Sequence, residues 1–186
     1  MKKLATFAAT AAFAIGVGLS GTALAANASK ELTASNNGGM DVGMVVVNDN
    51  GGSITVTYIT DGTWLITETH THLDPQDSEG DCLGWPMTGS GNPKVGKFDM
   101  QTTWPLPGSD MVVVTFADTF GDDSTVCVAA HAVVYVYDSS APGDAEEQFD
   151  ATNEGAWGDG DGTGHQFPGK NWAAYFTFVT DPAPPL

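Results

Sequence analysis

The segment TVCVAAHAVVYVY, residues 125–137, decides the expected fold, because small or apolar residues fill every second position. A period of two places successive side chains on opposite faces of a β-strand, so that one face can lie against a core. The face expected to be buried carries Val126, Val128, Ala130, Ala132, Val134 and Val136. The segment therefore predicts a long strand with one buried side.

Similar alternation predicts further strands at residues 44–47, 53–60, 63–73, 111–117 and 172–179. Turn signals separate them, and Asp61-Gly62 is typical of a tight hairpin. Loops are expected at 74–96 and 139–169, the second with one short helix near 144–150. The 23 glycines and 10 prolines also argue against a helical bundle. We therefore expect an all-β protein, a single-domain antiparallel β-sandwich or jelly roll.

The N-terminal residues Met1–Ala25 have the pattern of a secretory signal peptide. Two lysines precede a mainly apolar run, and Ala23-Leu24-Ala25 is a small-x-small cleavage pattern. The apolar run is short and contains glycine, whereas a membrane-spanning helix needs roughly 20 apolar residues. The mature protein is therefore expected to be secreted, outside the cell or in the periplasm, without insertion into a membrane.

Export also determines the interpretation of the two cysteines. Cys82 and Cys127 are an even number in an oxidising compartment, so a disulfide is expected. We expect a flexible leader at 26–40, the β-sandwich domain at 41–180 and a proline-rich tail at 181–186.

The charge of the chain limits its partners. It has 23 acidic residues, 6 lysines and no arginine, for a net charge of −17. A nucleic-acid partner is not expected, since phosphate binding needs cationic side chains. An anionic membrane surface would repel the chain for the same reason. An extracellular polysaccharide and a second copy of the chain are candidate partners, and the sequence identifies neither.

Histidines are the main candidates for chemistry. In the strand predicted at 63–73, one face is expected to carry Trp64, Ile66, Glu68, His70 and His72, and the other Leu65, Thr67, Thr69, Thr71 and Leu73. The His70-x-His72 pair places two imidazoles side by side, as zinc and copper sites require, and His131 could supply a third ligand. The alternative is structural, with packed imidazoles that donate an N–H to a carbonyl or to Glu68.

Acidic loops suggest a calcium-stabilised surface. The candidate ligands are Asp74, Asp77, Glu79, Asp81, Asp159 and Asp161. Calcium takes roughly six to eight oxygen ligands, which flexible Asp/Gly loops can supply. The loop at Asp159 is not an EF-hand, because Lys170 stands where the final glutamate is needed. The alternative is a hydrated acidic surface without a bound ion.

Aromatic residues suggest a further hypothesis, carbohydrate binding. Trp85, Trp104 and Trp157 are candidate surface platforms for stacking on sugars. In contrast, Trp172, Phe176 and Phe178 share a predicted strand face and are expected to fill the core.

No Gly-x-Ser-x-Gly motif occurs, and nothing selects a carboxylate pair for glycoside hydrolysis. A non-catalytic role is therefore favoured.

Five separated segments are similar to a known group of proteins. They are TETH (67–70), GNPKVGKF (91–98), AAHAVV (129–134), AWG (156–158) and FPGKNWAAYF (167–176). Together they resemble a widespread, unnamed domain of secreted bacterial, archaeal and some eukaryotic proteins. The resemblance implies an extracellular β-rich module, often attached to other surface domains, with no established activity. The chain departs from it in the glycine-rich residues 158–164 and in the acidic loop after Leu73.

Taken together, the sequence predicts a secreted, non-catalytic β-sandwich with a structural, surface or ligand-binding role, stabilised by calcium. The first alternative is a zinc- or copper-binding protein or metalloenzyme that uses the strand-borne His-x-His. The second is a carbohydrate-binding module.

Overall fold

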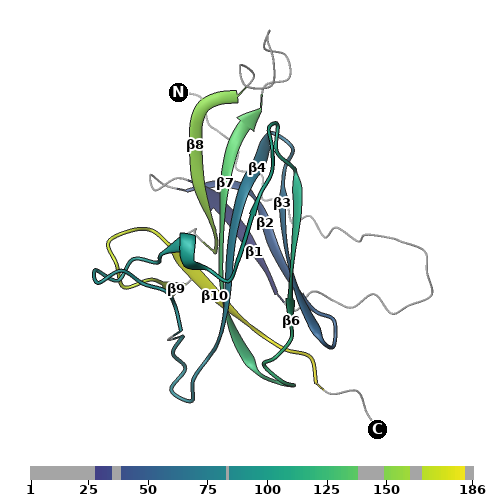
Figure 1. The fold of residues 1–186 in the computed structure, drawn as a ribbon, viewed down its shortest axis with the longest axis vertical. Coiled ribbons are helices and arrows are strands. Elements are labelled where there is room, and N and C mark those ends of the chain that lie inside the picture. Colours follow the sequence, from purple (N-terminus) through teal and green to yellow (C-terminus); the bar gives the residue numbers. More distant parts are fainter. Residues whose placement is uncertain (1–27, 35–38, 83, 138–148, 160–164, 183–186) are drawn as a thin grey trace, which may run out of the picture.

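The computed structural model of the chain describes residues 28–34, 39–82, 84–137, 149–159 and 165–182 (Figure 1). Its regular elements are strands, apart from one 3₁₀ turn, η1 (Val95–Lys97). The strands are β1 (Ala28–Ala34), β2 (Met40–Asp49), β3 (Ser53–Thr60), β4 (Trp64–Pro75), β5 (Met100–Thr103), β6 (Met111–Ala117), β7 (Thr125–Tyr137), β8 (Phe149–Gly158), β9 (His165–Gln166) and β10 (Ala174–Val179).

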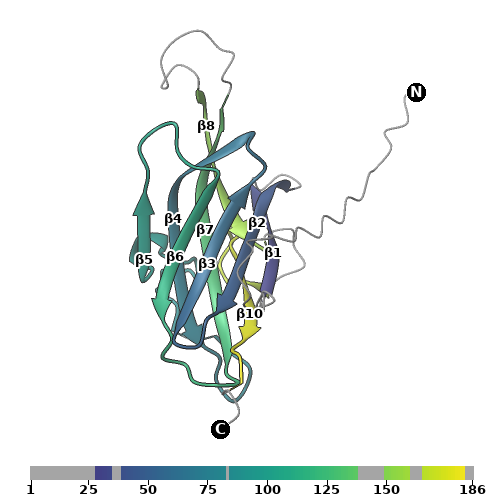
Figure 2. The same cartoon turned by 90° about the vertical axis from the view of Figure 1, so that its right-hand side faces the viewer.

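All strand pairs are antiparallel, and the main order is β5-β4-β7-β8-β1-β2-β3-β6. The long strand β7 is central. Along one edge it pairs with β4. Along the other edge β10 pairs with its first half and β8 with its second half, and the short β9 pairs with β10. Figure 2 shows β6, β3 and β2 side by side on the opposite part of the sheet.

The sheet curls until its two parts nearly meet, so that the layers belong to one sheet in a barrel-like shape. Closure occurs where the start of β6 approaches β4. Ile66 of β4 and Ser109 just before β6 exchange backbone hydrogen bonds of 2.8 and 3.0 Å. The expectation of an all-β, antiparallel, single-domain fold is confirmed.

Apolar side chains fill the interior of this curled sheet. On β7, the residues predicted to face inward at positions 126, 128, 130, 132 and 134 are all buried in the core. Phe176 and Phe178 of β10 join them, as expected. Tyr58 is the largest side chain that is fully buried, and its hydroxyl lies 2.7 Å from the Thr71 hydroxyl. Burial raises the pKa of Tyr58, so the phenol stays neutral.

Several boundaries differ from those predicted. Residues 28–34 are not a flexible leader but strand β1, whose Leu32 and Ala34 lie in the core. Strand β8 lies inside the predicted loop at 139–169, and β1 pairs with it as well as with β2. The predicted short helix lies largely outside the described residues, since 144–148 are not among them and 149–150 begin β8.

The predicted signal peptide lies outside the described residues, as do residues 183–186 of the tail. Within the described part of the chain, no helix is long and apolar enough to cross a membrane.

Candidate functional site

A β-bulge in β4 determines where the histidines point. Ile66 pairs with Val134 and Glu68 with Val133, so that Thr67 is an extra residue without a partner of its own on β7. A bulge of this kind reverses which side chains face the core beyond it. Ile66 is buried in the core, whereas Glu68, His70 and His72 lie on the outer face of the sheet. The prediction that Trp64 and Ile66 share a face with these three residues is therefore wrong.

The neighbouring chain helps to accommodate the bulge. The Trp104 N–H donates to the Thr67 carbonyl at 2.8 Å, and the Thr67 hydroxyl donates to the Val133 carbonyl at 3.4 Å. Gly108 packs so tightly here that a Cβ would lie 2.6 Å from the Ile66 carbonyl oxygen. Beyond the bulge, Thr69 and Thr71 occupy the core side and are fully buried.

The outer face brings two histidines together. His70 of β4 and His131 of β7 are direct cross-strand partners, and their ring centroids lie 5.5 Å apart. His70 Nε2 lies 3.3 Å from a carboxylate oxygen of Glu68, whose side chain is half exposed. The Nδ1 atoms of His70 and His131 are both buried without a hydrogen-bond partner. Two of the predicted site residues are therefore adjacent.

The environment of His131 strongly favours the neutral imidazole. Its ring packs against Trp157 at 4.8 Å between centroids, and on β8 the absence of a side chain at Gly155 leaves room for its Nε2. Burial, with a smaller contribution from the neighbouring His70, lowers the pKa of His131 to about 3. The residue as a whole keeps some exposed surface, but its Nδ1 atom is enclosed. Desolvation is the physical cause, because a buried imidazolium loses its hydration.

His72 lies farther along β4 and has different neighbours. Its ring contacts Trp85 at 5.4 Å and Phe98 at 5.6 Å between centroids. Its Nδ1 lies 2.9 Å from a carboxylate oxygen of Asp99, a close polar contact whose angle does not suit a hydrogen bond. On β7 the residue opposite His72 is Ala129. Sequence periodicity gives no indication of the contact with Asp99, because that residue lies between the predicted loop at 74–96 and the predicted strand at 111–117, where no element is predicted.

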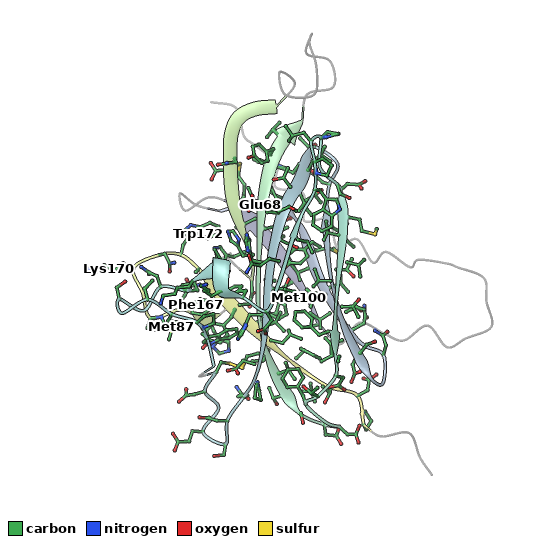
Figure 3. All side chains as sticks on the ribbon, viewed as in Figure 1. Glu68, Met87, Met100, Phe167, Lys170 and Trp172 are labelled. Atoms are coloured by element: carbon green, nitrogen blue, oxygen red, sulfur yellow. A yellow bond between two sulfur atoms is a disulfide. The ribbon has the colours of Figure 1, made fainter. Side chains whose placement is uncertain are left out.

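An aromatic layer covers this part of the outer face, and we call it the outer-face cluster. Its buried members are Cys82, Trp85, Phe98, Cys127, Ala129, Trp157, Phe167 and Ala173. Figure 3 shows Phe167, Met87 and Trp172 on the side of the sheet that carries η1, with Lys170 at the outer end of this layer. The rings contact one another, as with Trp85 and Phe167 at 5.3 Å. The cluster is a second, smaller core outside the barrel.

Two loops cover the outer face: the first lies between β4 and β5, and the second lies before β10. A disulfide and a close backbone contact hold them in place. The predicted disulfide is present between Cys82 in the first loop and Cys127 on β7, with Cα atoms 6.0 Å apart. The second covering loop crosses the first where Gly91 meets Gly169. A Cβ on Gly91 would lie 3.0 Å from the Gly169 backbone nitrogen, so this crossing needs residues without side chains.

The structure brings two of the three predicted zinc or copper ligands together and separates the third. His70 and His131 are adjacent, whereas the ring of His72 lies among Trp85, Phe98 and Asp99. In the described ranges, no three or more His, Cys, Asp or Glu side chains are arranged to hold a metal ion.

The candidate calcium ligands are spread over separate local contacts. Asp77 accepts the backbone N–H groups of Glu79 and Asp81, both at 2.9 Å, which closes a tight acidic turn. Asp74 instead accepts the Gly84 N–H at 2.5 Å. The buried Asp159 forms an ion pair with Lys30 at 3.1 Å, and its predicted partner Asp161 lies outside the described residues.

The structure places several tryptophans differently from the prediction. Trp85 and Trp157 are only 6% and 5% exposed, so the expectation that they form surface platforms is wrong. Trp104 is partly buried against the main core. Trp172 precedes β10 and packs against the outer-face cluster rather than filling the main core with Phe176. The disulfide and the loop crossing place the aromatic side chains, and strand periodicity contains no information about either.

Comparisons of the chain with protein-family models, with curated proteins and with solved structures found no match. The resemblance to a secreted, unnamed domain therefore stays a hypothesis. The segments that carry it do meet in space, because His70, Phe98, His131, Trp157 and Phe167 come from the five segments and join in or adjoin the outer-face cluster.

Proposed function

We propose that the chain is an exported, non-catalytic β-module with a structural, surface or ligand-binding role outside the cytoplasm. The carrying observation is the packing of His131, whose ring lies against Trp157 with its Nδ1 atom buried, into an apolar aromatic layer. Two further features support export. The N-terminal residues have the pattern of a signal peptide, and the buried Cys82–Cys127 disulfide suits an oxidising compartment.

The chemistry of His131 supports a structural role. An efficient general base has a pKa near the working pH and lies within hydrogen-bond reach of the substrate proton. His131 has a pKa of about 3 and an enclosed Nδ1, so it meets neither condition at neutral pH. His70 has Glu68 as a neighbour, and His72 has Asp99. The Asp99 contact suits a side chain that fixes the segment before β5 against the sheet, and the Glu68 contact suits one that orients the His70 ring on β4.

The proposal can be tested with the full chain expressed in a bacterial host. We expect it outside the cytoplasm, with Cys82 and Cys127 oxidised. Purified protein is then assayed against panels of ester and glycoside substrates, alongside the variant His131→Phe. Turnover that His131→Phe abolishes without changing the melting temperature would contradict a non-catalytic role. Recovery of folded protein in the cytosol with two free thiols would contradict export.

Calcium stabilisation is a separate part of the proposal. It is supported by the acidic turn from Asp77 to Asp81, where three exposed carboxylates lie within five residues. Melting the oxidised protein with calcium and with a chelator tests this part. An increase in melting temperature that the triple variant Asp77→Asn/Glu79→Gln/Asp81→Asn removes is the expected result. An unchanged melting temperature removes calcium from the account.

A second candidate function, zinc or copper binding, is favoured by one observation. His70 and His131 are cross-strand neighbours, and both have a buried Nδ1 without a partner. Buried polar atoms of this kind are uncommon and invite a ligand. Metal analysis of the purified protein, with His70→Gln as the comparison, tests this candidate. A stoichiometric metal that is lost in His70→Gln would favour it over the structural role.

A further inference from the structure

The outward side of β2, β3 and β6 is apolar and carries no charge in two successive rows. The register places Met44, Ile59 and Met111 in one cross-strand row and Val46, Thr57 and Val113 in the next. We call these six residues the β2–β3–β6 patch. Neither β3 nor β6 contains a charged residue along its whole length. Figure 2 shows these three strands as neighbours, away from the loops that form the outer-face cluster.

The patch is unusually accessible for apolar side chains. Met111 and Val113 are 49% and 54% exposed, and the other four members are partly exposed. Isolated exposed apolar residues are common on soluble proteins, but contiguous apolar patches indicate an interaction surface. The contrast is large in this chain, whose acidic residues outnumber its basic ones by 23 to 6.

Carboxylates border the apolar row. Asp61 lies in the turn after β3, and Glu31 of β1 is the cross-strand neighbour of Met44. Both acidic residues are exposed. An apolar centre with an acidic border is complementary to a partner with apolar side chains flanked by positive charge.

The lysines of the described chain lie elsewhere. Lys94 and Lys97 are in or beside η1 and Lys170 is in the second covering loop, all on the side of the outer-face cluster. Lys30 is opposite the buried Val45, which places it on the core side of β1, where it pairs with Asp159. A symmetric dimer through this surface would therefore bring no described lysine to it and would place carboxylates against carboxylates.

We propose that the β2–β3–β6 patch docks a cationic, amphipathic segment of another protein. Apolar side chains of that segment cover Met111 and Val113, and its lysine or arginine side chains pair with Asp61 and Glu31. The proposal names a partner class for the binding role proposed above. The patch lies on a different face from the outer-face cluster. The docking proposal can therefore fail while the non-catalytic role stands, and the non-catalytic role can fail while the docking proposal stands.

The probe is a short synthetic peptide of alternating valine and lysine, and its counterpart has glutamate in place of lysine. Binding to the oxidised protein is followed by fluorescence anisotropy. We expect Met111→Gln/Val113→Thr to weaken binding about tenfold, as for residues at the centre of an interface. Met100→Gln, an exposed methionine on β5, is the matched control and should change binding less than about twofold. Asp61→Asn should weaken binding more than Asp122→Asn, which removes the same charge in another turn.

Three results would overturn the proposal. The first is equal binding of the glutamate peptide. The second is equal effects of each patch variant and its control, which would mean general attraction to an acidic protein. The third is a concentration-dependent dimer in sedimentation experiments that Val113→Thr dissociates, which would identify a second copy as the occupant. Circular dichroism of each variant establishes that the fold is unchanged, and both patch substitutions are at exposed positions.

Discussion

Acidification should destabilise this protein through His131. The imidazole has a pKa of about 3 in the folded chain, well below the ordinary value of about 6.5 that applies in the unfolded chain. Between these two values the unfolded state binds a proton that the folded state does not. Stability from this group is therefore fully present above about pH 6.5 and is lost progressively as the pH falls toward 3.

The magnitude follows from the difference between the two pKa values. Each pH unit below the unfolded value costs about 1.4 kcal/mol, so the loss reaches about 3–4 kcal/mol near pH 4. That is a large share of the roughly 5–15 kcal/mol that stabilises a typical domain. Acidic side chains add their own pH dependence, so a variant is needed to isolate the histidine.

The measurement is urea unfolding, followed by tryptophan fluorescence, at a series of pH values between about 4 and 7. His131→Phe keeps a ring against Trp157 and cannot be protonated, so its stability should fall less steeply on acidification than that of the parent chain. The His131 ring signals in a two-dimensional NMR titration give the pKa directly. His165→Phe, at an exposed position on β9, is the control and should leave the difference unchanged.

Two results would refute this reasoning. One is an NMR titration in which His131 takes up its proton near pH 6. The other is a parent chain and a His131→Phe variant that lose stability in parallel down to about pH 4, since burial would then not be penalising the charged ring.

Three further substitutions test the packing. Cys82→Ala/Cys127→Ala opens a loop of 45 residues and should lower the unfolding free energy by about 4 kcal/mol in the chain-entropy model. Urea titration measures this loss, and a loss under about 1 kcal/mol would contradict the prediction. Thr71→Val removes the hydroxyl partner of buried Tyr58 and should cost about 1–2 kcal/mol, and a neutral effect would show that the phenol has other adequate partners. Gly158→Ala adds a methyl within 3.0–3.4 Å of three core side chains and should cost about 1–3 kcal/mol in thermal melts; an unchanged melting temperature would mean that the core has room to adjust.

The features that sequence could predict are those set by local pattern. Alternation in residues 125–137 correctly identified β7 and its inward side chains, because a strand with one buried face has a period of two wherever it lies. The disulfide followed from the even number of cysteines and from the expectation of export. Both inferences need only the chain itself and its surroundings, without knowledge of which strand lies beside which.

The strands that sequence missed depend on their neighbours. β1 and β8 have mixed polar sequences, ASKELTA and FDATNEGAWG, with no sustained alternation. They pair with each other and with β2 and β7, so their backbone hydrogen bonds depend on partners distant in sequence. The burial of Trp85 and Trp157 has the same origin, because it needs a loop that is bonded to β7 and folded back over the sheet.

The bulge at Thr67 connects the fold to the candidate site. In a strand with unbroken alternation, Trp64 and Ile66 would share a face with Glu68 and His70. If that face were buried, the core would have to accommodate a carboxylate. If it were outward, the indole and isoleucine side chains would be exposed. One extra residue resolves this conflict, since it keeps Ile66 in the core while turning the polar residues outward. The histidines then need cover, which the outer-face cluster supplies. The cluster is therefore best understood as a consequence of the bulge, and its packed imidazoles fit the non-catalytic role that we propose.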